Sequence, residues 1–440
     1  MTKGADMTAT LTLTRRGFLA TGAAVGAAAM LSPRLAFASP QDPTAGDVVV
    51  LVFLRGGADG LSLVAPWQMA SYHDKRPNIA VADEVGPPTR RGLALRAGGN
   101  VAAFDHDGTF ALHPAMSALH DGPWAAGDLA IVHAAGLPAS ESASRSHFES
   151  MRYIEHGSAH LGVNTGFLNR YLDALGGNTA LSAVGVGGLV QRSISGPVSA
   201  LSMNDPAAYG VSGFGDVAIA RNVLERWYGP SSPTDVVKSV GRATFAGMDA
   251  LEAVDWDSPA FAVQNAAQYP STKFGRELGY VAKLIRSNIG LKVACVDFGS
   301  WDTHDDMGTP GGGGWFDRLA GELSAGLAAF HRDLGSSMGE VSLVTVSEFG
   351  RTIDENGTGG TDHGRGSVMF AMGGGIRGGV HGSFVEQIQD GPEDDLTVLN
   401  DYRSVLSEIL TVRGGLPSTA AVFPTWAPQP ALGVCEAPNP

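Results

Sequence analysis

Cysteine is almost absent from this chain, whose 440 residues include only Cys295 and Cys435. At most one disulfide can form, and a cysteine-rich zinc site is excluded. Cys295 lies in the apolar run KVACVDF, which favours a buried thiol over a disulfide.

Charge is also scarce, and basic charge above all. Charged residues make up 17% of the chain, and 30 Lys and Arg stand against 44 Asp and Glu, a net charge of -14. No run of Lys and Arg is longer than a pair, which argues against a nucleic-acid-binding surface. An anionic substrate would have to be bound by a local site. The 44% hydrophobic content and the length allow a sizeable core.

Long hydrophobic runs are missing too. The most apolar segment, residues 17–31, is diluted by glycine and is shorter than the roughly 20 residues that cross a bilayer. It follows the pair Arg15-Arg16 and precedes an A-x-A site at Ala36 and Ala38, which is typical of a twin-arginine signal. We therefore expect residues 1–38 to be removed, leaving a periplasmic or secreted protein, exported folded, with no stable membrane insertion.

Short apolar runs alternate with helical patterns along the rest of the chain. Six runs that end in polar or glycine-rich turns predict buried strands; they begin near residues 47, 129, 181, 291, 340 and 367. Apolar residues recur every three to four positions over 274–289 and 316–334, and again from Tyr402, which predicts helices. This alternation indicates one α/β domain, residues 39–440, with a mostly parallel sheet. Residues 191–270 lack the strand rhythm and are interpreted as an insertion or cap.

Polar residues gather where the predicted strands end. In a doubly wound sheet, ligands bind beyond the carboxyl ends of the strands. The motifs there are RGGADGLS, SESASRSHFES, GSWDTHDD, SEFGRT and GTDHGRG, with Asp59, Ser146, His147, Asp302, His304, Glu348, Arg351, Asp362 and His363. Carboxylates and imidazoles at several strand ends together favour a site for Zn, Mn, Mg or Ca.

Each of these residues also has a purely structural interpretation. Asp59 fits a turn in A-D-G, and Glu348 with Arg351 fits an ion pair at a strand end. Ser146, with Glu149 three residues later, fits a capping box at a helix N-terminus. His304 could cap a helix. These alternatives stay open at the level of sequence.

Other chemistries have less support. The G-x-S-x-G match that begins at Gly335 lies between a predicted helix and a strand, whereas a nucleophile elbow needs a strand, a turn and a helix in that order. We interpret it as a linker. The glycine run near Gly311 lacks the Lys-Ser/Thr of a P-loop, and no G-x-G-x-x-G follows the first strand.

The motifs VVLVFLRGGADGLSLVAP, SRSHFE, GSWDTH, VTVSEFGRT and GTDHGRG, in this order after a twin-arginine signal, resemble the exported family known as domain of unknown function 1501. That family is similar to the alkaline-phosphatase-like superfamily of phosphatases, sulfatases and phosphoglycerate mutases. The resemblance implies a three-layer α/β sandwich, with a mostly parallel central sheet and helices on both faces. It also implies a two-metal site and a nucleophile that attacks an anionic ester.

The resemblance also implies roles for particular residues. Asp59 matches an Asp that binds one metal after the first strand, and Ser146 is the best match for the nucleophile. Asp302, His304, Glu348, Asp362 and His363 match the remaining metal positions. Phe349 stands where the superfamily has a ligating His, and only one residue separates Asp302 from His304. These departures leave open whether one metal ion or two would bind, and His147 could compensate.

Two functions follow as expectations. The first is an exported, metal-dependent hydrolase or transferase that acts on a small phosphate or sulfate ester, or on a sulfated or phosphorylated polymer. Ser146 or a water would attack, His147 would assist, and Arg351 or Arg145 would bind the anion. The alternative is a non-catalytic envelope binding or assembly protein with a degenerate metal site.

Overall fold

A computed structural model describes residues 46–142, 144–212, 215–229, 235–388 and 395–436. The signal-peptide prediction, residues 1–38, lies outside the described residues. So does the expected cleavage site.

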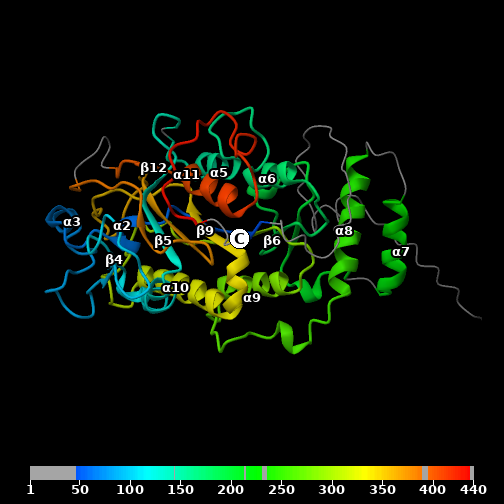
Figure 1. Cartoon of the computed structure of the whole chain (residues 1–440), viewed down its shortest axis with the longest axis horizontal. Helices are drawn as coiled ribbons and strands as arrows, with labels where there is room; N and C mark the ends of the chain where they lie inside the picture. The colour runs from blue at the N-terminus through cyan, green and yellow to red at the C-terminus, as the bar shows by residue number, and fades with distance from the viewer. Residues whose placement is uncertain (1–45, 143, 213–214, 230–234, 389–394, 437–440) are drawn as a thin grey trace, which may run out of the picture.

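All six predicted strands form and lie in one sheet (Figure 1). They are β1 (Val48–Leu54), β5 (Leu129–Gly136), β6 (Ala183–Val186), β8 (Val293–Phe298), β9 (Val341–Ser347) and β10 (Ser367–Gly373). Three short strands that the apolar pattern missed complete the sheet: β7 (Leu201–Met203), β11 (Gly379–His381) and β12 (Asn400–Asp401). The order is β11-β5-β10-β9-β1-β8-β6-β7, with β12 paired to β5.

The sheet is mixed, with one strand reversed. Strand β1 lies between β8 and β9 and is parallel to both, whereas β10 is antiparallel to β9 and to β5. A parallel return needs a long crossover, usually helical, and residues 348–366 between β9 and β10 contain no helix. The prediction of a mostly parallel sheet is confirmed, and the one reversed strand is the sixth predicted run.

Helices cover both faces of the sheet. Alternate residues of β1 enter opposite cores: Val50, Val52 and Leu54 pack with α9 and α10, and Val49, Leu51 and Phe53 pack with α5, α6 and α11. In Figure 1, α9 (Lys273–Arg286) and α10 (Trp315–Leu334) lie below the sheet, and α5 (His147–His156), α6 (Phe167–Leu175) and α11 (Tyr402–Glu408) lie above it. The three predicted helices are confirmed as α9, α10 and α11.

A helical pair lies at one end of the molecule, within the segment interpreted as an insertion or cap. It consists of α7 (Val217–Trp227) and α8 (Val236–Glu252), to the right in Figure 1. Arg221 of α7 bonds Glu225 on its own helix and Asp249 and Glu252 on α8, which holds the two helices together. Whether this pair is a separate insertion stays a prediction.

Shorter elements fill the opposite end. They are α2 (Gly60–Leu63), α3 (Ala70–Lys75), α4 (Ser117–Leu119) and a small antiparallel sheet of β2 (Val64–Ala65), β3 (Leu93–Ala94) and β4 (Ala111–Leu112). Residues Gly335–Glu340, the G-x-S-x-G match, form a 3-10 turn between α10 and β9, so the linker interpretation is correct.

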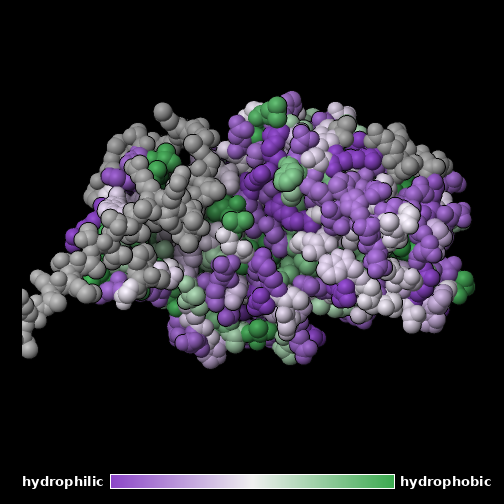
Figure 2. Space-filling view, turned by 180° about the vertical axis from the view of Figure 1, so that it is seen from behind, coloured by the Kyte–Doolittle hydropathy of each residue, from purple (hydrophilic) through white to green (hydrophobic). Residues whose placement is uncertain are grey.

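The described surface is largely polar. The face in Figure 2 is mostly hydrophilic, with apolar residues in small scattered groups. Within the described ranges, every helix is too short or too polar to cross a bilayer. Cys295 is buried and Cys435 is partly buried, and both are free thiols.

Candidate metal centre

The direction of the strands brings distant motifs to one edge of the sheet. Strands β1, β5, β8 and β9 all end at this edge, because β10 is antiparallel to both β5 and β9, and β1 is parallel to β8 and β9. Asp302 follows β8, Glu348 follows β9, and His147 begins α5 after β5. The reversed β10 starts at this edge, which places His363 in the same cluster.

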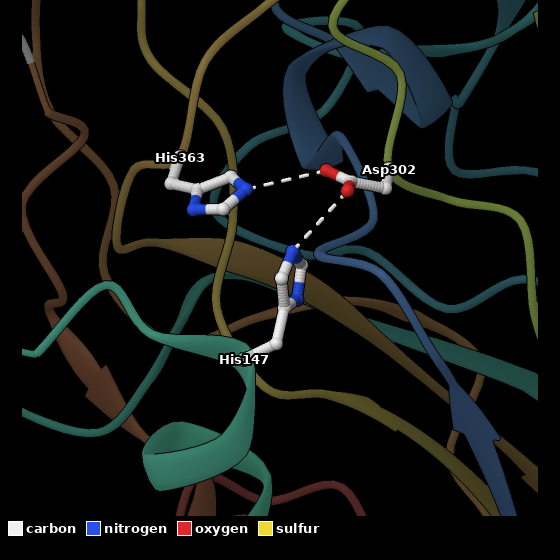
Figure 3. Close-up of side chains that lie close together, drawn as sticks. All are labelled: His147, Asp302 and His363. Atoms are coloured by element: carbon white, nitrogen blue, oxygen red, sulfur yellow. Dashed lines mark hydrogen bonds and ion pairs between the residues drawn. The ribbon is translucent and has the colours of Figure 1, made fainter.

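Asp302 lies at the centre of three imidazoles (Figure 3 shows two of them). Its Oδ1 is 3.0 Å from His304 Nε2 and 3.2 Å from His363 Nε2, and its Oδ2 is 3.4 Å from His147 Nε2. The Nε2 atoms of His304 and His363 are 2.9 Å apart. Each imidazole therefore presents its Nε2 to one carboxylate, although the side chains come from three separate segments of the chain.

The other ring nitrogen of each imidazole faces an oxygen. His147 Nδ1 is 2.8 Å from Glu348 Oε1, and His304 Nδ1 is 2.7 Å from Asp362 Oδ1. His363 Nδ1 is 2.8 Å from the backbone carbonyl of Arg145. A carbonyl or carboxylate oxygen accepts a hydrogen bond, so each ring can carry its proton on Nδ1, and this tautomer leaves Nε2 free to ligate a metal ion beside Asp302. Histidines that ligate metals are usually oriented in this way.

The residues present fit a divalent transition metal. His147 Nε2 is buried and has no hydrogen-bond partner among the described residues, although its Nδ1 is bonded. Ligand atoms of His147, Asp302 and His363 all lie within 4.8 Å of one another. Imidazole nitrogen with one carboxylate is a donor set that suits Zn and related metals. Three of the predicted ligands, Asp302, His304 and His363, thus lie together with His147, which was predicted as a catalytic residue.

Arg351 is part of the framework and not an exposed anion-binding group. Its side chain is 0% exposed, and its Nη2 is 2.6 Å from Asp302 Oδ1. The guanidinium also donates to four backbone carbonyls, those of Gly56, Gly57, Trp301 and Thr361. All of its donors are directed inward, so the prediction that Arg351 binds a substrate anion is replaced by a positioning role for Asp302.

The charges around Asp302 keep it ionised. Burial opposes its ionisation, but the bond to Arg351 and the charge of its guanidinium outweigh burial and lower the pKa of Asp302 to about 2. The hydrogen bond from His147 to Glu348 raises the pKa of His147, whereas burial lowers the pKa of His363. The cluster thus joins a firmly anionic carboxylate to imidazoles with different proton affinities.

Glu348 and Asp362 hold imidazoles and do not point their bonded oxygens at the centre. The Glu348 side chain is fully buried, and its Oε1 accepts both His147 Nδ1 and the Gly56 N–H, at 2.8 Å each. Asp362 is more exposed and bonds His304. Both were predicted as metal ligands. In the structure each is hydrogen-bonded to an imidazole of the cluster and so lies behind that ring, away from Asp302.

Phe349, which follows Glu348, packs against two of the imidazoles. Its ring centroid is 4.9 Å from that of His147 and 4.8 Å from that of His363. It therefore supports two imidazoles by contact. Gly57 makes room for it: φ is +74°, and a Cβ there would come within 2.5 Å of the Phe349 ring. His147, which comes from another segment, lies beside this phenylalanine.

Asp59 is not brought to the cluster. It caps α2 by accepting the Ser62 N–H, and it pairs with Arg76 at 2.7 Å, with both side chains almost fully buried. Arg76 in turn donates to the Thr352 and Ile353 carbonyls. This corrects the prediction of Asp59 as a metal ligand: its carboxylate neutralises a buried arginine that ties α3 to the segment after β9.

Ser146 is the N-cap residue of α5, but the predicted capping box does not form. Its side chain makes no capping bond, and the residue is exposed. Glu149 instead accepts the Ser144 hydroxyl at 2.6 Å. The hydroxyl of Ser146 is therefore not committed to holding the helix, one residue away from His147.

A small cavity of about 20 Å³ lies beside the cluster. Its lining includes Ser142, Ser144, Ser150, Glu348 and Phe349. Arg365, also in the lining, pairs with Asp395 at 3.0 Å. Sequence reasoning singled out the serines only as members of a polar run. Arg145 supports His363 through its backbone carbonyl and not through its side chain. The amino-acid sequence therefore contains no signal for this role.

Comparison with known proteins gives a match to one family model over part of the chain, and no activity. Residues 244–408 match the family model described as "Protein of unknown function (DUF1501)", which confirms the family resemblance for this segment. The segment contains Asp302, His304, Glu348 and His363, but not His147. No curated protein matches the chain.

Similarity to solved structures is weak. The crystal structure of Ps i-CgsB has a TM-score of 0.30 and 10% identity, covering 86% of this chain and 74% of that one. The alkaline phosphatase from the Antarctic bacterium TAB5 has a TM-score of 0.27 and 10% identity, covering 74% and 92%. A mutant of that enzyme with Mg bound in its M3 site has a TM-score of 0.25 and 9% identity, covering 75% and 92%.

Proposed function

We propose that the chain binds a divalent metal ion through His147, Asp302, His304 and His363 and hydrolyses or transfers a phosphate or sulfate ester there. One observation carries the metal: the three Nε2 atoms surround Asp302 while each Nδ1 is held by an oxygen acceptor. The choice of an ester as the substrate follows from the sequence resemblance.

When bound, the metal would polarise an ester oxygen and favour attack by a nearby hydroxyl or water. The residues of the chain have separate tasks. Asp302 supplies the negative charge, kept anionic by Arg351. Glu348 and Asp362 orient two of the imidazoles, and Phe349 packs against His147 and His363 to exclude water from one side of them.

The attacking group is either Ser146 or a water. Ser146 is exposed and its hydroxyl makes no capping bond, so it is available for chemistry. An unaided serine is a weak nucleophile and needs a neighbouring base or metal. In the proposal the metal bound at His147, the next residue in the chain, would meet this need.

The alternative function, a non-catalytic envelope binding or assembly protein, is favoured by one observation. Both arginines considered for anion binding have other partners: Arg351 is fully buried, and Arg145 pairs with Asp395 at 2.5 Å. An anionic ester would depend on the metal alone for its charge. We also retain the proposal of twin-arginine export on the Arg15-Arg16 pattern.

The test has two stages. Metal analysis of protein purified from its native host should find Zn, Mn or a related ion, which disappears in His363→Gln. Metal-loaded protein is then screened against aryl phosphate and aryl sulfate esters, with Ser146→Ala as the matched variant.

Loss of turnover with unchanged melting would identify Ser146 as the nucleophile, and full turnover would assign the attack to water. Metal binding without turnover of any ester would favour the non-catalytic alternative. Absence of metal from the native protein would contradict the whole proposal.

A further inference from the structure

A groove of about 350 Å³ lies between α9 and the segment 263–271 that precedes it. Its lining combines cations and aromatic rings: Arg276, Lys283, Arg286, Tyr269 and Tyr280. None of the described residues that line it is acidic, although Asp and Glu outnumber Lys and Arg in the whole chain.

Two of the cations form no ion pair within the described part of the chain. Neither Arg276 nor Lys283 forms an ion pair or a side-chain hydrogen bond with another described residue. They are seven residues apart on α9, so they share a helix face and are separated by about 10.5 Å along its axis. Unpaired charges at this spacing are suited to two successive anions on one extended ligand.

The third cation belongs to a rigid network beneath the groove. Arg286 Nη1 is 3.0 Å from Asp333 Oδ1, and the Tyr269 hydroxyl donates to Asp333 Oδ2 at 2.9 Å. Arg286 Nε is buried and has no hydrogen-bond partner among the described residues. Asp333 therefore balances the charge of Arg286 and fixes the ring of Tyr269.

The two tyrosines are held in place by their hydroxyls. Tyr280 donates to Asp205 Oδ2 at 3.2 Å, so both rings are fixed at the polar end. Gly279 lies beside the Tyr269 ring, which a Cβ there would meet at 3.7 Å, so a long side chain at this position would extend over the ring. Fixed aromatic rings offer flat apolar surfaces at little entropic cost.

We infer that this groove binds an acidic glycan, with sugar rings on Tyr269 and Tyr280 and successive acidic groups on Arg276 and Lys283. Regularly repeated anions on apolar-faced rings match the pattern of the lining. A nucleic acid would need a broader basic surface than two unpaired cations on a chain of net charge -14. The inference does not require the metal centre, since none of the four proposed ligands lines the groove.

The experiment is calorimetric titration of the whole protein with oligogalacturonate and with sulfated dextran, using neutral dextran of equal length as the control. We expect the anionic oligomers to bind, with affinity that falls as salt rises, and the neutral oligomer not to bind. Preference for oligogalacturonate or sulfated dextran distinguishes a carboxylated from a sulfated glycan.

The matched variants change the same charge in two places. Arg276→Gln/Lys283→Gln removes the unpaired cations and should weaken binding by about tenfold or more. Arg226→Gln/Lys238→Gln removes one Arg and one Lys on α7 and α8, outside the groove, and should leave the affinity within about twofold. Equal losses of affinity in the two double variants would show that binding depends only on the net charge of the protein, and would overturn the inference.

A charge-neutral variant tests the groove itself. Gly279→Met fills the space beside Tyr269 and also replaces a glycine within a helix, which by itself favours the helix. Binding should be lost while melting stays as high as in the wild type. Unchanged binding in Gly279→Met, equal binding of neutral dextran, absence of binding by both anionic oligomers, or tighter binding of a phosphoserine peptide would each overturn the assignment.

Discussion

The Nε2 atoms of His304 and His363 face each other at 2.9 Å, while their Nδ1 atoms face Asp362 and the Arg145 carbonyl. With both Nδ1 atoms protonated, two lone pairs would point at one another. An additional proton or a metal cation relieves this repulsion, and Asp302, 3.0 Å and 3.2 Å from the two nitrogens, supplies the negative charge that favours either. This pair is the reason to expect metal to stabilise the fold.

Metal should therefore raise the stability of the wild-type protein. At a free concentration of 100 times Kd, a ligand of the native state adds about 2.7 kcal/mol to the free energy of unfolding. A chelator should remove this gain, and His363→Gln should not show it. Thermal melting with and without Zn or Mn measures the effect, and His160→Gln, at an exposed histidine, serves as the control. Equal shifts in the two variants would contradict a site at His363.

Glu348→Gln tests the support of His147. The buried carboxylate accepts the His147 Nδ1–H, and loss of its charge should lower metal affinity by about 10- to 100-fold. Asp354→Asn, which removes a more exposed carboxylate paired with Lys75, should leave metal affinity unchanged. Competition with a metal-sensitive dye gives both values. Wild-type affinity in Glu348→Gln would remove His147 from the ligand set.

Arg351→Lys should weaken both metal binding and the fold, because lysine cannot reach four carbonyls and Asp302 with one ammonium. We expect a loss of about 1–3 kcal/mol, because buried carbonyl acceptors lose their hydrogen-bond donors. Arg413→Lys weakens the buried pair of Arg413 with Asp47, near the start of β1. It should reduce stability similarly and leave metal affinity intact, so equal metal affinities in the two variants would argue against a positioning role.

Asp59→Asn separates the two interpretations of that residue. In the structure it neutralises the buried Arg76, so the variant should lose about 3–5 kcal/mol of stability and keep its metal. Denaturant unfolding and metal analysis of the same preparation provide the test. Loss of metal with little change in stability would restore Asp59 as a ligand.

Acid should destabilise the protein through two buried histidines that are not among the proposed metal ligands. Burial lowers the pKa of His133 to about 4, and burial lowers the pKa of His113 as well. In the unfolded chain these groups titrate near 6.5. The unfolded state therefore binds more protons between about pH 6.5 and 4, and stability falls as pH decreases through that window.

The slope should approach about 1.4 kcal/mol per pH unit for each histidine. Urea unfolding at several pH values measures it. His133→Gln keeps a hydrogen-bond donor near the Val64 carbonyl and should remove its share of the slope. A stability that is flat between pH 6.5 and 4 would contradict the neutral, buried state of His133.

Much of the fold was predictable from local patterns. The apolar run before Arg55 forms the predicted strand β1, and the periodic segment around Phe316 forms the predicted helix α10. In both cases the pattern of apolar residues shows which side chains are buried, and this determines the type of element. The direction of β10 was not predictable, because an apolar run looks the same whichever way it crosses a sheet. Its reversal depends on the helix-free segment that follows Glu348.

The candidate site was predictable in part for the same reason. Asp302 and His363 stand in polar motifs at strand ends, and the fold brings strand ends together. The role of Asp59 depended on Arg76, a residue with no distinguishing pattern in the sequence. The role of Arg351 depended on carbonyls contributed by distant loops, which no spacing of side chains reports.

Because β10 is reversed, residues 348–366 leave the edge of the sheet and return to the same edge without crossing the fold. This one excursion carries Glu348, Arg351, Asp362 and His363, whereas Asp302 and His147 belong to other segments. A local opening of the excursion would thus dismantle most of the centre while the sheet stays intact. Amide hydrogen exchange of residues 348–366 would then report whether metal occupies the centre. Exchange in this loop should slow when metal is bound, while exchange in the strands stays the same.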